Sequence, residues 1–304
     1  MKTRKLGNTE IKVSEIGVGT HQFGAADWGG PKEEECAAII DEALRLGATF
    51  IDTAPDYAGG RSEEILGVAL QGRRDQAVLC TKFSVGPDQI EQSVEASLRR
   101  LRTDYLDVLL IHSPPADVTD GTSAPHYRVL QRLKDTGVIR AYGVSGRADT
   151  AAEIRMIAET TGSQAIEIRF NALYQDPAAA FEQAAESGVG LIVKVPLESG
   201  WLSGKYTATS VFDEARSRWS ADDIAHRAKL VEEFQELLPT GVRTVHAALS
   251  HILAQPQVST VVPGTKSLAQ LRENIAAVDV VLPAETLAAI RNLQNIHIDN
   301  RLSW

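Results

Sequence analysis

YLDVLLIH, at Tyr105–His112, is the clearest indication of the architecture in this sequence. The four residues from Val108 to Ile111 are all apolar, so side chains on both faces of this strand are expected to be buried. Burial on both faces is typical of a parallel sheet that has helices on one side and a packed interior on the other. The segment therefore predicts an α/β protein.

Similar runs rich in Val, Ile and Leu recur along the chain, separated by longer segments whose apolar residues recur at intervals of three and four. This alternation predicts parallel β-α-β units. The expected strands are Ile16–Thr20, Thr49–Ala54, Ala77–Lys82, Tyr105–His112, Ile139–Gly146, Ala165–Asn171, Gly190–Pro196 and Ser259–Gly264. Eight units favour closure into a (β/α)8 TIM barrel. The alternative, an open doubly wound sheet, needs a glycine-rich phosphate turn, and Gly17-Val18-Gly19 lacks the third glycine.

The first helix between the expected strands is Pro31–Leu46, a surface helix with one buried stripe. Three segments fall outside the repeat. Thr3–Ser14 is expected to be a hairpin that covers the bottom of the barrel. Ser199–Pro239 is a long insertion with a helix at Ala221–Leu238, and insertions of this length usually serve binding. Pro283–Asn295 is expected to be an additional helix. No linker divides residues 1–304, so a single domain is predicted.

Composition restricts the partners. The formal net charge of −9 argues against nucleic acid as a partner, because proteins that bind many phosphates present a basic face. A small-molecule ligand is therefore expected.

No apolar stretch is long enough to cross a bilayer, and no leader precedes the first strand, which predicts a cytoplasmic protein. Cys36 and Cys80 lack metal or disulfide spacing, so no metal site is expected. The oligomeric state is left open.

Polar side chains stand where three consecutive strands end. Asp52 ends the second expected strand, Lys82 the third and His112 the fourth, and Tyr57 follows Asp52 on the same loop. Taken singly, each of these four side chains is compatible with a purely structural role. In a parallel barrel the carboxyl ends of strands face the active site, and adjacent strands are about 4.8 Å apart, so the four groups are expected to converge.

This group suits hydride transfer coupled to a proton. A tyrosine is a weak acid near neutral pH, and a neighbouring cation such as Lys82 would lower its pKa. Asp52 would supply the counter-charge that a partly desolvated lysine needs. His112 would orient the substrate oxygen or relay the proton.

The sequence resembles the aldo-keto reductase family along nearly its whole length. The resemblance rests on Phe50–Tyr57 with Ser62-Glu63, Thr81–Phe83, Leu110–His112, Tyr142–Ser145, Pro196–Tyr206, and Val262–Ser267 leading to Gln270 and Asn274. It implies that Tyr57 is the proton donor, Lys82 its tuning cation, Asp52 the partner of Lys82, and His112 the residue that aligns a carbonyl. The implied reaction reduces an aldehyde or ketone with NADP(H), which lies extended across the barrel mouth.

The resemblance also implies residues for the cofactor and the substrate. The first two strand ends contribute Gly19, Thr20 and Asp52, and the loop after the seventh strand contributes Leu197, Ser199, Gly200, Leu202 and Lys205. The adenosine end is assigned to Gly264, Thr265, Lys266, Ser267, Gln270 and Asn274. Lys266 would contact a 2′-phosphate, which favours NADP over NAD. Candidates for the substrate wall are His21, Phe23, Trp28, Trp201 and Trp219.

The nicotinamide clasp departs from the family pattern. A Ser-Asn pair and a Gln are common there, whereas this chain has Ser145-Gly146 and Glu167, with Lys194 on the next strand in place of an aromatic residue. Ser145, Glu167 and Lys194 are still expected beside the cofactor. Our hypothesis is that Glu167 and Lys194 form an ion pair there, since each would be costly to bury alone.

Two other functions use the same residues. A dehydrogenase that oxidises an aldose or polyol with NAD(P)+ would employ Tyr57 as a base. A sensor or regulatory subunit would bind the cofactor with little turnover, as some family relatives do.

Overall fold

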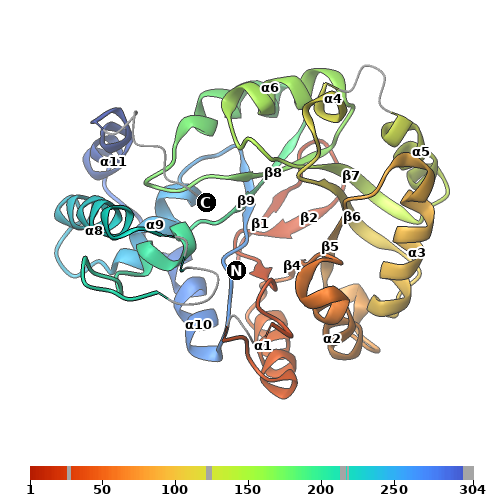
Figure 1. Cartoon of the computed structure of the whole chain (residues 1–304), viewed down its shortest axis with the longest axis horizontal. Helices are drawn as coiled ribbons and strands as arrows, with labels where there is room; N and C mark the ends of the chain where they lie inside the picture. The colour runs from red at the N-terminus through yellow and green to blue at the C-terminus, as the bar shows by residue number, and fades with distance from the viewer. Residues whose placement is uncertain (26–28, 121–124, 213–216, 218, 297–304) are drawn as a thin grey trace.

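The computed structural model describes residues 1–25, 29–120, 125–212, 217 and 219–296. Eight parallel strands form one sheet, with helices around it (Figure 1). In chain order the strands are β3 (Val18–Gly19), β4 (Phe50–Asp52), β5 (Val78–Phe83), β6 (Leu106–His112), β7 (Ile139–Ser145), β8 (Ala165–Arg169), β9 (Gly190–Lys194) and β10 (Val258–Val261). Each expected strand is confirmed, with ends that differ by up to three residues.

The sheet closes on itself because its first and last strands meet. Neighbouring strands follow one another in chain order from β3 to β10. Parallel bridges then join Ile16 to Val261 and Gly19 to Gly264, and the Gly17 amide donates to the Val261 carbonyl at 2.8 Å. The (β/α)8 prediction is therefore confirmed, and the open doubly wound sheet is excluded.

Helices surround the barrel, and several of them bury an apolar stripe. They are α1 (Glu33–Arg45), α2 (Arg61–Ala69), α3 (Ile90–Leu101), α4 (Ala116–Thr119), α5 (Pro125–Asp135), α6 (Ala151–Thr160), α7 (Phe181–Glu186), α8 (Ala221–Glu236), α9 (Thr244–Leu253), α10 (Leu268–Ala276) and α11 (Ala284–Ile296). In α1 the buried side chains are Cys36, Ile39, Ile40 and Ala43, as their spacing predicts. The Glu35 carboxylate accepts a hydrogen bond from the amide of Lys32, the N-cap residue, at 2.8 Å, so this amide has a partner at the start of the helix.

The N-terminal hairpin closes the barrel at the amino ends of the strands. β1 (Thr3–Lys5) and β2 (Lys12–Ser14) pair antiparallel. Leu6, Ile11 and Val13 are buried in the barrel interior with side chains of β4 and β6. Gly7 has a φ of +54°, and a Cβ there would lie 2.3 Å from the Gly188 carbonyl oxygen, so only glycine fits. The predicted position of the hairpin is confirmed.

The insertion after β9 begins with a 3-10 segment, Glu198–Ser203, and continues to α8. The helices predicted at Ala221–Leu238 and Pro283–Asn295 correspond to α8 and α11. In Figure 1 both lie on one side of the barrel, beside α9. Among the described helices, none has the length and apolar character that a membrane crossing would need.

Candidate active site

The structure brings Asp52, Tyr57, Lys82 and His112 together at the carboxyl ends of β4, β5 and β6. Lys82 Nζ donates to the Asp52 carboxylate and, at 3.1 Å, to the Thr53 carbonyl. The same nitrogen lies 5.4 Å from the centroid of the Tyr57 ring. The rings of Tyr57 and His112 are 6.3 Å apart and nearly perpendicular. Residues that are 60 positions apart in sequence thus share one small volume.

Burial dominates the electrostatics of this group. Burial lowers the pKa of Lys82, but Asp52 and Glu167 raise it by more, so the pKa lies well above its usual value and the ammonium is charged. Burial raises the pKa of Tyr57 well above that of a free tyrosine, although Lys82 opposes this change. The expected lowering by Lys82 is thus present but outweighed. Burial, followed by Lys82, lowers the pKa of His112, so this side chain is neutral at pH 7.

Asp56 is a neighbour of His112 that the sequence did not indicate. Its Oδ2 lies 3.3 Å from His112 Nδ1 and accepts from Ser84 Oγ at 3.1 Å. These contacts place the Asp56 carboxylate beside the imidazole ring. Asp56 directly precedes Tyr57, and this adjacency to the expected acid is the one signal that could have identified it.

The predicted ion pair between Glu167 and Lys194 is wrong. Glu167 Oε2 lies 3.3 Å from Lys82 Nζ, and Glu167 Oε1 accepts from Ser145 Oγ at 3.1 Å. Lys194 instead pairs with Asp149 at 3.3 Å and donates to the Gly146 carbonyl at 2.7 Å. The reason is register, because Glu167 stands opposite Ile192, two residues before Lys194. Glu167 consequently faces the interior while Lys194 lies nearer the rim.

The Glu153 carboxylate fills the space that a side chain at position 146 would occupy. The Glu153 carboxylate accepts from the amides of Arg147, Ala148 and Asp149, at 3.0, 3.2 and 2.8 Å. A Cβ on Gly146 would lie 2.7 Å from Glu153 Oε2. The loop after β7 is therefore organised around Glu153, and an asparagine at position 146 would displace it.

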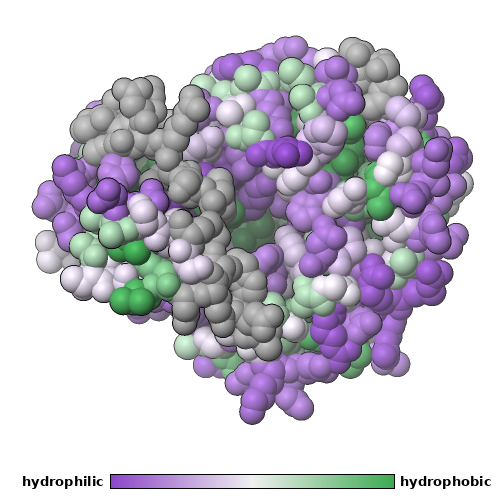
Figure 2. Space-filling model, viewed as in Figure 1, coloured by the Kyte–Doolittle hydropathy of each residue, from purple (hydrophilic) through white to green (hydrophobic). Residues whose placement is uncertain are grey.

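A pocket of about 820 Å³ extends from this group across the carboxyl ends of the strands. Figure 2 shows this face hollowed near the centre of the ring of helices. The expected residues that line the pocket are Gly19, His21, Asp52, Tyr57, His112, Ser145, Glu167, Lys194, Leu197, Ser199, Gly200, Lys205, Gly264, Lys266, Gln270 and Asn274. Gln22, Arg243 and Glu273 also line it and were missed, because Gln22 lies in a turn, Arg243 directly before α9 and Glu273 within α10, without a distinctive sequence pattern.

Four expected cofactor residues support the pocket without lining it. Thr20 is buried and donates to the Asp52 carbonyl at 2.8 Å. Ser267 caps α10 by accepting from the Gln270 amide at 3.2 Å. Thr265 is buried and donates to the Pro263 carbonyl at 3.2 Å, and Leu202 is buried among α8, α9 and α11. Their side chains hold the lining segments in place.

Of the aromatic candidates for the substrate wall, His21 lines the pocket. Phe23 is fully buried in the barrel core. Trp201 and Trp219 pack against each other, with ring centroids 5.9 Å apart, in a cluster with Tyr206 and Phe212. The two tryptophans stabilise the insertion, and none of the three side chains lines the pocket. Trp28 lies outside the described residues.

The pocket fits an extended, phosphate-bearing cofactor. Within the described part of the chain, Glu167 Oε2 at one end is buried without a hydrogen-bond partner, and so is Asn274 Nδ2 at the other. Between them Ser199 and Gly200 have positive φ values and present backbone to the pocket. Lys205 and Lys266 supply positive charge in its lining, and Arg243 pairs there with Glu273 at 2.7 Å. The unsatisfied polar atoms and the cations are the features that such a ligand requires.

The buried carboxylates do not form a metal site. Ligand atoms of Asp52, Cys80 and Glu167 lie within 4.8 Å of one another. The Lys82 ammonium, however, contacts both carboxylates and supplies the positive charge at this position. Lysine has no acceptor atom for a metal while it is protonated.

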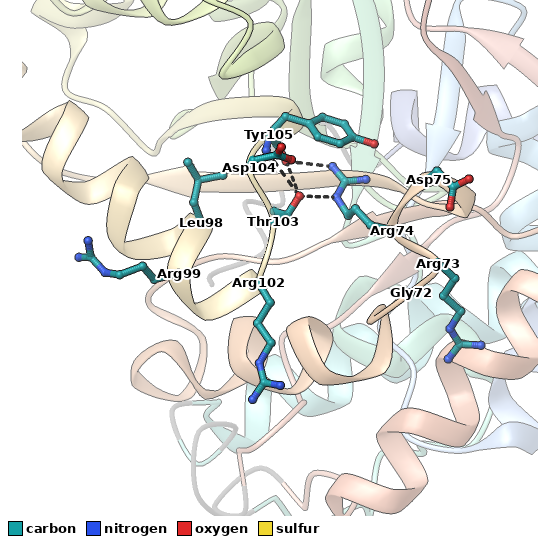
Figure 3. A pocket seen from close by; sticks show the side chains of 10 residues that line it. All are labelled: Gly72, Arg73, Arg74, Asp75, Leu98, Arg99, Arg102, Thr103, Asp104 and Tyr105. Atoms are coloured by element: carbon teal, nitrogen blue, oxygen red, sulfur yellow. Dashed lines mark hydrogen bonds between the residues drawn. The ribbon is translucent and has the colours of Figure 1, made fainter.

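A second pocket, of about 760 Å³, lies at the opposite, amino-terminal end of β5 and β6 (Figure 3). The side chains of Arg73, Arg99 and Arg102 point in different directions in this view. Arg74 donates to Thr103 Oγ1, the Tyr105 carbonyl and Asp107. These contacts hold the loops together, so this pocket is structural.

Comparison with known proteins agrees with the site. The sequence model of the Aldo/keto reductase family matches residues 15–295. The NADH-specific methylglyoxal reductase of Escherichia coli is 30% identical, over 96% of this chain and 98% of that protein. The holo form of aldo-keto reductase AKR11C1 from Bacillus halodurans is 30% identical over 96% of both chains, with a TM-score of 0.80. Glycerol dehydrogenase AKR11B4 from Gluconobacter oxydans is 26% identical over 99% and 97%, with a TM-score of 0.82. The chain therefore belongs to the aldo/keto reductase family.

Proposed function

We propose that this protein reduces an aldehyde or ketone to an alcohol with NADPH, and that Tyr57 donates the proton. The observation that carries the proposal is the buried Tyr57 beside the Lys82 ammonium, in a pocket of about 820 Å³. Because the pKa of Tyr57 is raised, its hydroxyl is fully protonated at neutral pH, as a proton donor must be.

The other members of the group support this proton transfer. The cofactor, when bound, supplies the hydride. Lys82 stabilises the phenolate that remains when the Tyr57 proton leaves, and Asp52 holds the ammonium in place. His112, oriented by Asp56, lies beside Tyr57 and would position the carbonyl oxygen between the two side chains.

An activity screen tests the proposal. The protein is assayed with NADPH and a panel of aldehydes and ketones, beside Tyr57→Phe. We expect turnover by the wild type and a loss of at least about 10²-fold in kcat for the variant, with cofactor affinity unchanged. Tyr105→Phe, at the opposite end of the barrel, is the matched control and should retain activity. Full turnover by Tyr57→Phe would contradict the assignment.

The cofactor preference is tested at Lys266. A cation in the adenosine part of the pocket favours a 2′-phosphate, and a charge-assisted hydrogen bond contributes about 1.5–3 kcal/mol. We expect Lys266→Ala to weaken NADPH binding by about tenfold or more, with little effect on NADH. Fluorescence titration with both nucleotides measures this. Tighter binding of NADH than of NADPH by the wild type, as the name of the E. coli relative would suggest, would refute the preference.

The second candidate is oxidation of a polyol or aldose. It is favoured by the similarity to a protein named glycerol dehydrogenase. In that direction Tyr57 must accept a proton, which its raised pKa opposes below strongly alkaline pH. Glycerol and aldoses with NADP+ and NAD+, assayed from pH 7 to pH 10, separate the candidates. A dehydrogenase would show oxidation at neutral pH that exceeds carbonyl reduction.

A further inference from the structure

The buried carboxylate of Glu167 contacts both Ser145 and Lys82. It is 2% exposed and lines the pocket. Its Oε1 accepts from the Ser145 hydroxyl, while Oε2 lies 3.3 Å from Lys82 Nζ and has no hydrogen-bond partner among the residues that the structure describes. The carboxylate of Asp52 contacts the same ammonium from β4. Two carboxylates thus share one buried cation.

The charges around this group do not balance when both carboxylates are ionised. Lys82 contributes +1 against −2. From β6, His112 is neutral at pH 7, since burial and then Lys82 lower its pKa. From β9, Lys194 is paired with Asp149 instead of Glu167.

From β5, burial raises the pKa of the Cys80 thiol well above its usual value, and burial likewise raises that of Tyr57, so both are neutral. A net charge of −1 would remain, and burying it is costly.

One bound proton removes this cost. Ligand oxygens of Asp52 and Glu167 lie within 4.8 Å of each other, so the charge on one carboxyl strongly affects the protonation of the other. Burial, followed by repulsion from Glu167, raises the pKa of Asp52 to about 7. Burial raises the pKa of Glu167, but Lys82 and Lys194 lower it by more, so its pKa lies below the usual value. The pair therefore gains or loses its proton near neutral pH.

We propose that Asp52 and Glu167 act as one proton-holding pair, and that binding of an oxidised nicotinamide cofactor releases this proton whereas binding of the reduced cofactor does not. This inference rests on the proposed function. The oxidised ring carries a positive charge, and beside Glu167 that charge balances the pair with both carboxylates ionised. The reduced ring is neutral and leaves the proton in place. Glu167 is thus a positioning residue. With Asp52 it keeps the buried charges balanced, by losing a proton when the oxidised cofactor binds and keeping it when the reduced cofactor binds.

Calorimetry of cofactor binding tests this inference. NADP+ and NADPH are titrated into the full chain at pH 7.0, in PIPES and in Tris, whose heats of ionisation differ. We expect the heat of NADP+ binding to depend on the buffer, with release of about half a proton per site, since the pair is half protonated at its own pKa. For NADPH the dependence should be absent. The 2′-phosphate titrates equally in both nucleotides, so it cancels from the comparison.

A pH series gives a second measurement. The affinity for NADP+ relative to that for NADPH should increase about tenfold from pH 6 to pH 8, because one proton is released along this range. Glu167→Gln should abolish both effects while its far-UV circular dichroism stays unchanged. Asp107→Asn, which removes a buried carboxylate at the far end of the barrel, is the matched control and should retain them.

Equal buffer dependence for the two nucleotides in the wild type would overturn the inference, and so would a proton release that persists in Glu167→Gln. Either result leaves the proposed reductase function intact, because both nucleotides still bind. Failure of both nucleotides to bind would overturn the proposed function together with the inference.

Discussion

Asp52 and Glu167 connect the stability of the fold to pH. The pKa of Asp52 is about 7 in the folded chain, against 3.8 for a free carboxyl group. Between these values the folded state binds a proton that the unfolded state does not. The free energy of unfolding therefore falls as the pH rises from about 4 to 7, and the cost of the unbalanced charge is fully present above pH 7.

Glu167→Gln should remove this cost. Asp52 then pairs with Lys82 alone, and the buried charges balance at every pH near neutrality. We expect the variant to be more stable than the wild type at pH 8.5, by about 1–3 kcal/mol, with a smaller difference at pH 5. Urea unfolding at both pH values measures the effect. A difference that is the same at pH 5 and pH 8.5 would show that Glu167 carries no linked proton.

The sequence predicted which residues would meet at the site, but not all of their contacts. Asp52, Lys82 and His112 end consecutive strands, and a barrel allows their side chains few other positions. The partner of Glu167 was wrong because pairing depends on register. Glu167 lies level with Ser145 and Ile192, so Lys82 is within reach across the interior while Lys194 is too far along its strand.

Glu198 anchors the segment that leaves β9. Its carboxylate accepts from Arg169 Nη2 at 2.7 and 2.8 Å and from Asn171 Nδ2 at 2.8 Å. Arg227 of α8 approaches to 3.9 Å, and all of these side chains are buried. Ser199 and Gly200, which line the pocket, follow directly. The network thus holds one wall of the pocket against the barrel.

Glu198→Ala should loosen this wall. The two arginines would lose their buried counter-charge, so we expect the free energy of unfolding to fall by about 3–5 kcal/mol. Nucleotide affinity should fall as well, because the backbone of Ser199 and Gly200 is no longer fixed. Urea unfolding and nucleotide titration measure the two effects. Glu236→Ala, at the exposed end of α8, should change neither; equal effects from both variants would refute the anchoring role.

Elements were predicted more reliably than their surroundings. Runs that are apolar on both faces leave few alternatives to a buried parallel strand. The ends were less certain. β3 is shorter than expected, because Ile16, at the start of the expected strand, is joined to Val261 only by an isolated bridge. Trp201 and Trp219 were expected at the pocket, but hydrophobicity alone does not distinguish a packed aromatic side chain from one that faces a ligand.

Across the whole molecule, the candidate site and the contacts that stabilise the fold lie at opposite ends of the barrel. The pocket and its charged groups occupy the carboxyl ends of the strands, while the hairpin and the arginine contacts of Figure 3 occupy the amino ends. Substitutions at the amino ends are therefore expected to change stability without changing the chemistry.

Gly7→Ala tests this division. Its Cβ would collide with backbone atoms of Gly188 and Gly190, in a left-handed conformation that alanine disfavours. We expect the free energy of unfolding to fall by about 3 kcal/mol, with kcat/KM of the remaining folded protein unchanged. Gly72→Ala is the matched control, because Gly72 also has a positive φ but nothing lies within 4 Å of its Cβ. A loss of kcat/KM in Gly7→Ala, or equal destabilisation by both variants, would contradict the division.

The hairpin also sets an order of events during synthesis. The Asn8 amide donates to the Gly188 carbonyl at 2.8 Å. The hairpin can therefore form this hydrogen bond only after a residue 180 positions later has been translated. Until β9 has left the ribosome, Leu6, Ile11 and Val13 have no interior to enter. The hairpin therefore emerges before β9 and can pack into the barrel only after β9 has been made. During that interval its apolar side chains are available to a chaperone.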